Sequence, residues 1–325
     1  MITGISHANI RVNDIDKCLP FYRDVLGMEM FFAPSTPAVN TGLSSEPGAM
    51  ISFARVRVPG GTFQMEMVEW SGAALKPQQL RIQDPGEIML AFNVRDFDTK
   101  LANAKKMGLQ VVSKNGEPYV SEGRGGPNKA VMLRDPNGFI VELTDVAFNP
   151  ATAASAPAGG ITNVAIWFTV ADLAQTVNFY NKAFGMTLAT PNPAGPANDR
   201  IKGLFNDPSI ATTRNVRGTF PNTDLTISFQ EFTGPARKPV HHRVIDPGGP
   251  IMTMNVEEFP AVMEQVRANG GVFGDGDASA PMPTTAAATW VRDPNGILLR
   301  ISPPPQGRGR GNAAPGGAAA PAGRQ

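Results

Sequence analysis

The chain has few of the features that mark membrane, disulfide-rich or nucleic-acid-binding proteins. Its one cysteine, Cys18, cannot form an intramolecular disulfide, and no convincing base for a catalytic thiol lies beside it in sequence. No apolar run approaches the roughly 20 residues that cross a bilayer. A formal charge of +1 over 325 residues gives no broad electrostatic reason to bind nucleic acid or an anionic membrane. We therefore expect neither partner, and we interpret Cys18 as a small apolar residue on a helix.

The beginning of the chain also lacks a signal. Met1 is followed directly by Ile2, Thr3 and Gly4, without the basic and apolar regions of a secretory signal peptide. We expect a cytoplasmic protein, although removal of a signal peptide would leave the same kind of start.

Two copies of one module run down the chain. The motif Arg134–Gly138 (Arg-Asp-Pro-Asn-Gly) recurs as Arg292–Gly296, which is 158 positions later (292 against 134). The pair Phe21 and Tyr22 recurs as Phe179 and Tyr180 at the same offset. A repeat at fixed offset sets the domain count, and 325 residues suits two domains of roughly 150 residues each.

Composition marks the boundaries of the two copies. A stretch rich in Ala, Gly and Pro separates them, and from Pro303 the chain becomes Pro, Gly, Ala and Arg without periodic apolar residues. The expected domains are 1–147 and 161–303, joined by a linker at 148–160 and followed by a disordered tail at 304–325. The domains should pack on each other within the chain.

Each half shows the order strand, helix, strands, and shows it twice. Asp14 or Asp16 can cap the first helix, which should run through Leu26, with Gly27 as its stop. In the first half we expect strands at 5–12, 28–33, 48–58, 62–70, 88–94, 109–113, 128–134 and 139–145, and helices at 14–26 and 96–107. The same order is legible from 162 to 302, which indicates an α+β fold.

This order, with a His in the first strand and Asp-Pro-Asn-Gly followed by Glu, resembles the vicinal oxygen chelate superfamily of glyoxalase I, extradiol dioxygenases and the fosfomycin- and bleomycin-resistance proteins. The resemblance implies two βαβββ modules per domain, whose strands curl into an incomplete barrel around a pocket with helices outside. It places the family's metal-ligand positions on His7, Glu66, Met89 and Glu142.

Strand alternation provides an independent check on these positions. In the first strand Ala8, Ile10 and Val12 share one face, which leaves His7, Asn9 and Arg11 on the other. The same alternation puts the following residues on the face away from the helices: Gln64, Glu66, Met89, Asn93 and Glu142. All four family positions therefore fall on the face that would line the pocket.

The side chains of His7, Glu66 and Glu142 could together hold a divalent ion such as Zn, Ni, Co, Mn or Fe(II). The resemblance then implies a glyoxalase-like, metal-dependent lyase or isomerase, in which Glu66 or Glu142 moves a proton on a small substrate that chelates through oxygen. Asn9, Arg11, Gln64, Met89 and Asn93 are the candidate substrate-binding residues, although the polar ones could equally line a wet groove.

Met89 departs from the family pattern and leaves alternatives open. A thioether is a poor ligand for such ions, so a metal-free small-molecule binder of the bleomycin-resistance type is the competing hypothesis. An extradiol dioxygenase would need a second histidine at that position. The substrate, any glutathione dependence, the metal and the oligomeric state are not determined by the sequence, since specificity would come from loops such as 34–48, 115–127 and 191–222.

The second half lacks metal ligands. The repeat maps His7 to Ala165 and Glu142 to Arg300, while an offset of 162 (246 against 84) maps Glu66 to Ser228 and Met89 to Ile251. Arg300 would favour an anion or form a structural salt bridge. His241 and His242 are adjacent and should point to opposite sides of an extended strand, so we expect surface or interface residues and not a chelating pair.

Overall fold

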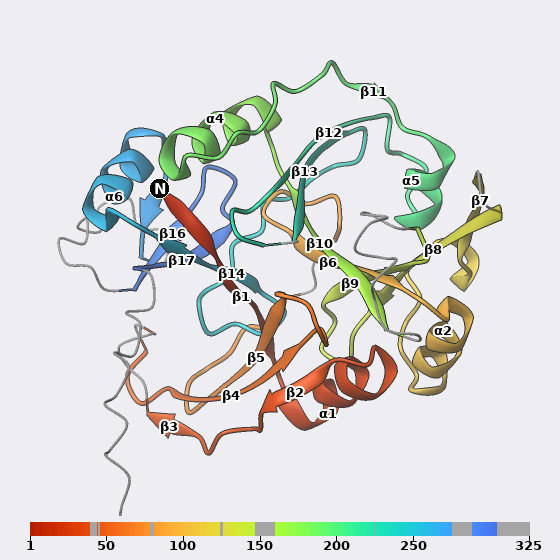
Figure 1. The fold of residues 1–325 in the computed structure, drawn as a ribbon, viewed down its shortest axis with the longest axis horizontal. Coiled ribbons are helices and arrows are strands. Elements are labelled where there is room, and N and C mark those ends of the chain that lie inside the picture. Colours follow the sequence, from red (N-terminus) through yellow and green to blue (C-terminus); the bar gives the residue numbers. More distant parts are fainter. Residues whose placement is uncertain are drawn as a thin grey trace, which may run out of the picture.

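Two mixed β-sheets with helices on the outside form the molecule (Figure 1). The computed structural model describes residues 1–39, 44, 46–78, 81–123, 126–146, 160–223, 225–274 and 288–303. The predicted linker, apart from Gly160, and the predicted tail at 304–325 lie outside these residues. Within them, no helix has the length and apolar character needed to cross a membrane.

The first sheet, sheet A, combines strands from both ends of the chain. Its central strand β1 pairs in parallel with β5 and antiparallel with β14, which comes from the second half of the chain. The strand order is β15 (Val272–Phe273), β16 (Thr289–Arg292), β17 (Leu298–Ser302), β14 (Pro250–Val256), β1 (Ile2–Val12), β5 (Gln64–Ser71), β4 (Met50–Arg57) and β2 (Glu29–Phe32), and β3 (Ala38–Val39) pairs with β4.

The second sheet, sheet B, is built from the middle of the chain. Its order is β11 (Gly195–Pro196), β12 (Thr212–Thr219), β13 (Thr226–Thr233), β10 (Ile161–Thr169), β6 (Ile88–Val94), β9 (Ile140–Thr144), β8 (Gly126–Arg134) and β7 (Tyr119–Gly123). The antiparallel pair of β10 and β6 joins the two halves. Neither sheet therefore belongs to one half of the sequence.

This pairing corrects the expectation that each half builds its own barrel around its own pocket. The two repeats and the βαβββ order are as predicted, and the two halves pack within one chain. However, the first module pairs with the fourth and the second with the third. Alternation along a strand specifies which side chains face the core but not which strand becomes the neighbour, so the sequence pattern could not distinguish the two arrangements.

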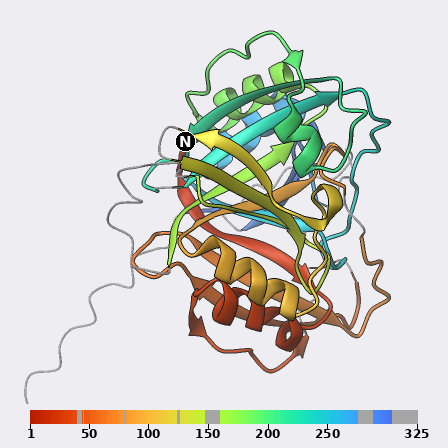
Figure 2. The same ribbon diagram turned by 90° about the vertical axis from the view of Figure 1, so that its right-hand side faces the viewer.

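The helices pack in pairs that stay within each half of the chain. Helix α1 (Ile15–Pro20) continues as a π-helix, η1 (Phe21–Val25), which packs against α2 (Phe97–Lys106), while α4 (Leu173–Phe184) packs against α6 (Phe259–Ala268). Figure 2 shows α1 and α2 together on one side of the sheets and α4 on the opposite side. The remaining helical segments are α5 (Asp199–Leu204) and a 3₁₀ turn, η2 (Lys114–Gly116).

Local chemistry explains where these helices begin and widen. The Asp14 side chain accepts a hydrogen bond from the Lys17 N–H at 3.0 Å and so caps α1, and Asp172 caps α4 in the same way. Pro20 lies at the end of α1, where it cannot donate a hydrogen bond, and the next turn closes from Leu26 N–H to Phe21 C=O as a π-turn.

One predicted strand is not formed as expected. Residues 109–113 contribute only an isolated bridge from Val111 to Leu133, and the edge strand in this region is β7, within the predicted loop 115–127. Short apolar runs such as Val111–Val112 are weak strand signals, because they fit an extended connection packed on a core equally well.

The alternation of the strands does match the structure. Ala8, Ile10 and Val12 lie in the main apolar core, together with Leu90, Phe92 and the aromatic residues of the helices. Cys18 is fully buried there and donates to a carboxylate oxygen of Asp135 at 3.3 Å, as expected for a residue on the inner side of a helix. The opposite faces of the two sheets carry two smaller apolar clusters and the polar residues considered next.

Candidate functional site

A set of polar side chains lies on the face of sheet A that points away from the main core. Register places them on one surface, since His7 lies opposite Thr253, Thr253 beside Arg300, and Glu66 between Asn9 and Arg55. We call this set the sheet A polar cluster; it comprises His7, Asn9, Arg11, Arg55, Glu66, Thr253 and Arg300.

Glu66 is the central anion of the cluster and is 6% exposed. Its Oε2 atom accepts a hydrogen bond from Arg55 Nε at 2.6 Å, and its Oε1 atom lies 3.6 Å from Nε2 of His7, an electrostatic contact longer than a hydrogen bond. Burial alone would raise the pKa of this carboxyl, but His7 and Arg55 outweigh it and lower the pKa to about 2. Glu66 is therefore a fixed negative charge and a weak base.

Arg11 and Arg300 bring two more guanidinium groups to the cluster. Their Cζ atoms lie 5.9 Å and 5.7 Å from the ring centroid of the same side chain, Trp290. Arg11 Nε donates to the Val244 carbonyl at 2.7 Å, whereas Arg11 Nη1 and Arg300 Nε are buried without a hydrogen-bond partner. Burial lowers the pKa of Arg11 to about 9, against the opposing effect of Glu66, so this group remains charged at neutral pH.

Asn9 plays a mainly structural part in this cluster. Its Nδ2 atom donates to Thr253 Oγ1 at 2.7 Å, which links β1 to β14 where the two halves of the chain join. Gln64 is half-buried at the start of β5, on the same face as Glu66. Of the predicted substrate-binding residues, Asn9, Arg11 and Gln64 thus belong to sheet A.

Glu142, the third predicted metal ligand, lies on β9 of sheet B and does not join His7 and Glu66. It is fully buried, and its Oε1 atom accepts a hydrogen bond from Arg200 Nη2 of α5 at 2.9 Å. Burial raises its pKa, although Arg200 and Arg217 act in the opposite direction. The expectation that the three groups meet in one N-terminal barrel is corrected here, because β1 and β5 belong to one sheet and β9 to the other.

Met89 and Asn93 also lie in sheet B, on β6. Met89 is buried in an apolar cluster with Trp167 and with Leu204 and Phe205, which α5 and the residue after it contribute. Asn93 donates to the backbone carbonyls of Thr144 and Val146 and so supports the end of the neighbouring strand. Side chains of the protein itself therefore cover most of the face of sheet B that carries Met89.

The residues present do not fit the divalent-ion site that the resemblance implies. Among the residues the structure describes, no three His, Cys, Asp or Glu side chains gather as a metal cluster would require. On sheet A, His7 and Glu66 are accompanied by Ile251 and Arg300 at the two other ligand positions. A guanidinium group repels a cation, and Arg55 already occupies one oxygen of Glu66.

Three contributors to these faces could not be recognised from the sequence alone. Arg55 becomes the partner of Glu66 because β4 pairs with β5, and Thr253 joins through β14. Arg200 comes from the loop 191–222, where composition gave no conformation. The repeat did point to Arg300 as a residue that favours an anion, but not to its neighbours.

His242 differs from the surface residue predicted by the sequence, whereas His241 is exposed as expected. His242 is 1% exposed, and both of its ring nitrogens are buried without hydrogen-bond partners. Burial, reinforced by the cations of Arg292 and Arg11, lowers its pKa to about 3. Its ring fills the space beside Gly249, where an added Cβ atom would lie 2.1 Å from Cδ2 of the imidazole.

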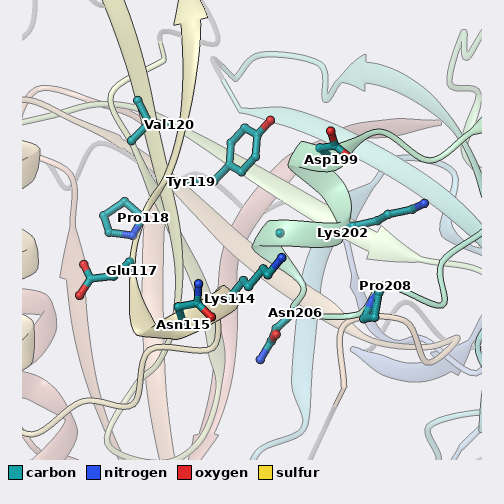
Figure 3. Close-up of a pocket in the computed structure, with 11 residues that line it drawn as sticks. Lys114, Asn115, Glu117, Pro118, Tyr119, Val120, Asp199, Lys202, Asn206 and Pro208 are labelled. Atoms are coloured by element: carbon teal, nitrogen blue, oxygen red, sulfur yellow. The ribbon is translucent and has the colours of Figure 1, made fainter.

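A cavity of about 750 Å³ lies outside these polar faces, between η2, β7 and α5 (Figure 3). In the close-up Lys114 and Asn206 come from opposite walls, while Glu117 points away from α5. Glu117 pairs with Lys105 at 3.3 Å, and Tyr119 packs against Gly203. None of the predicted site residues lines this cavity, so it is separate from the sheet A polar cluster.

The family model described as Glyoxalase/Bleomycin resistance protein/Dioxygenase superfamily matches residues 4–143 and 160–301. The chain belongs to this superfamily. The match covers both repeats, so both are superfamily domains, even though each sheet combines one module from each repeat. No curated protein sequence matches the chain significantly.

Solved structures agree on the superfamily fold. Glyoxalase I from Zea mays has a TM-score of 0.56 at 17% identity, with 92% of each chain covered, and a variant of the same enzyme gives the same values. A proposed dioxygenase from Bacillus subtilis has a TM-score of 0.52 at 14% identity, covering 94% of this chain and 86% of that one. At these identities the likeness concerns the fold alone.

Proposed function

We propose that the chain binds a small oxyanion on the polar face of sheet A and transfers a proton on it, without a metal ion. The single observation that carries this proposal is the chemistry of the donors. Arg11 Nη1 and Arg300 Nε are buried N–H groups without partners in one cluster, and buried donors are normally matched by acceptors. An anionic oxygen is the acceptor that satisfies a guanidinium best.

The charge of the cluster supports the same ligand. Glu66 is the only carboxylate in the sheet A polar cluster, and Arg55 is already paired with it at 2.6 Å. Among the residues that the structure describes, no ion pair joins Arg11 or Arg300 to a carboxylate, although the charge of Glu66 acts on both. Arg300 and Arg55 are only partly buried, whereas the Arg11 Nη1 and Arg300 Nε atoms are buried, so an anion would reach these donors by displacing side chains around them.

The proton-transfer step follows from the pair of His7 and Glu66. The imidazole of His7 would take a proton from a carbon next to a carbonyl group, and the electron pair would move onto the carbonyl oxygen. Arg11 and Arg300 would stabilise that oxyanion, while Glu66 would stabilise the imidazolium that forms. Where that carbon also bears a hydroxyl group, the hydroxyl proton would pass to the enediolate oxygen and His7 would deliver its proton to the former carbonyl carbon, which completes an isomerisation with no net change in charge.

This assigns the predicted lyase or isomerase chemistry to different groups. Glu66 would orient His7 and stabilise its protonated form. It would not itself be the base, since its pKa is lowered to about 2. Glu142 would have no part in the step. The guanidinium groups would take over the charge stabilisation that the resemblance assigns to a divalent ion.

Exchange of carbon-bound hydrogen tests the proposal. Unlabelled 2-oxo and 2-hydroxy carboxylates would be incubated with the protein in D2O, and loss of the α-hydrogen signals would be followed by NMR. We expect exchange with the wild type, at least a 100-fold slower rate in His7→Ala, and retained anion binding in that variant. Absence of exchange from every carboxylate in the wild type would contradict the proton-transfer step.

A binder without turnover is the second candidate, and one observation favours it. Arg55 and His7 hold the Glu66 carboxylate from both sides, so the cluster resembles a structural ion-pair network as much as an acid–base site. Anion binding without hydrogen exchange would select this candidate. Elemental analysis of purified protein would test the metal-free aspect of both, because stoichiometric metal lost in His7→Ala and Glu66→Gln would restore the metal-dependent hypothesis.

A further inference from the structure

We propose that the ligand of the sheet A polar cluster is a dicarboxylate, with one carboxylate for Arg11 and one for Arg300. This inference rests on the proposed oxyanion site and adds its charge and shape. It uses features that single-anion binding does not require: two separate unpartnered guanidinium donors and their attachment to different strands.

The count of charges favours a dianion. The cluster contains the three guanidinium groups of Arg11, Arg55 and Arg300, and Glu66 is its one carboxylate. Because Arg55 and Glu66 form a direct ion pair, a monoanion would leave one of the other two cations unmatched. A ligand with two negative charges would match both.

The placement of the two cations favours separate carboxylates over one compact group. Arg11 lies on β1 and Arg300 on β17, with β14 between them. Adjacent strands are about 4.8 Å apart, so these two backbones are separated by roughly 10 Å. The side chains converge on Trp290, which lies within 6 Å of both guanidinium carbons. Two carboxylates on a short carbon spacer suit this arrangement better than a single phosphate.

Each guanidinium still has a donor to offer such a ligand. Arg11 is fixed by its Nε bond to the Val244 carbonyl, which leaves Nη1 as the buried donor without a partner. Arg300 offers Nε, and it is the more exposed of the two residues. Arg300 would therefore meet the ligand first and is the safer residue to replace.

Calorimetric titration of the full chain with simple anions tests the proposal. Succinate and butyrate are the key pair, because they have the same number of carbons and differ by one carboxylate, and inorganic phosphate is the compact comparison. We expect succinate to bind at least about 10-fold more tightly than butyrate and phosphate at constant ionic strength.

Variants then assign the second carboxylate to Arg300. Arg300→Gln should weaken succinate binding about 10-fold to 100-fold, toward the affinity of butyrate, and Arg300→Lys should recover part of the loss. Arg23→Gln is the matched control, because it removes an exposed guanidinium paired with Asp24 and should leave binding unchanged. If Arg300→Gln does not fold, the succinate and butyrate affinities of the wild type decide.

The possible failures are distinguishable. Equal affinity for succinate and butyrate, both weakened in Arg300→Gln, would overturn the dicarboxylate and leave the oxyanion site intact. Tighter binding of phosphate than of succinate would overturn the dicarboxylate in favour of a compact dianion. If no anion binds, or if Arg300→Gln changes nothing, the oxyanion site itself is wrong.

Discussion

Replacing Glu66 by glutamine should lower the free energy of unfolding by about 3 kcal/mol at neutral pH. The pKa of this carboxyl falls from 4.5 to about 2 in the folded protein. One pKa unit corresponds to about 1.4 kcal/mol, which gives the magnitude for this nearly buried group. Because the folded pKa is the lower one, the contribution is complete above pH 4.5 and is lost as the pH falls toward 2.

Urea unfolding of the wild type and Glu66→Gln at several pH values measures this contribution. The difference between the two proteins should be largest at pH 7, unchanged at pH 5 and clearly smaller at pH 3. Glu29→Gln is the matched control, since Glu29 forms the same kind of pair with Arg57 of β4 at 2.9 Å but is half-exposed. That change should cost less than about 1 kcal/mol.

Two results would refute the reasoning. A Glu66→Gln variant as stable as the wild type at pH 7 would mean that the ion pairs around Glu66 offset no more than its burial. A difference that is the same at pH 3 and pH 7 would mean that the ionised carboxylate is not the stabilising species.

Three further predictions follow from the same contacts. Residues 1–147 expressed alone should show no cooperative unfolding, because β1 and β6 then lack their partner strands β14 and β10. Co-expression with residues 148–325 should restore cooperative unfolding. A stable folded monomer of one half would disprove the pairing of strands between the two halves. Arg200→Met should lower the free energy of unfolding in urea by about 2 kcal/mol, less than for a fully buried ion pair because Arg200 is 27% exposed. The double variant Arg200→Met with Glu142→Leu should recover most of this loss. If it recovers none, the broken ion pair is not the cause. The wild type should lose stability as the pH falls from 6.5 to 4, because the pKa of His242 is lowered to about 3 in the folded protein and only the unfolded chain binds a proton in this range. His242→Leu should reduce this loss. An unchanged pH profile would contradict a buried neutral imidazole.

The alternation along each strand predicted which side chains face the main core, but not which strands pair with each other. Ala8 and Ile10 in the core, with His7 and Asn9 opposite, follow from the period of two along a strand. The same pattern could not tell whether β1 would lie beside β6 or β14, because these are equivalent apolar strands of the two repeats. The pattern therefore groups Glu142 with the wrong neighbours, although it correctly predicts that Glu142 lies on the face of its strand opposite Val141 and Leu143 in the main core.

The residues that sequence reasoning missed depend on long-range contacts. Arg55 alternates correctly on its strand, but it becomes the partner of Glu66 only through the antiparallel register of β4 and β5. His242 is buried because Gly249 leaves room for its ring, a relation between two residues in a loop and at a strand start. No period or motif carries such information.

A crystal structure of the full chain grown with succinate tests the central claim most directly. We predict that its carboxylate oxygens lie within hydrogen-bond distance of Arg11 Nη1 and Arg300 Nε, while Glu66 stays paired with Arg55. Succinate bound elsewhere, or a divalent ion held by His7 and Glu66 with Arg300 turned away, would contradict the account.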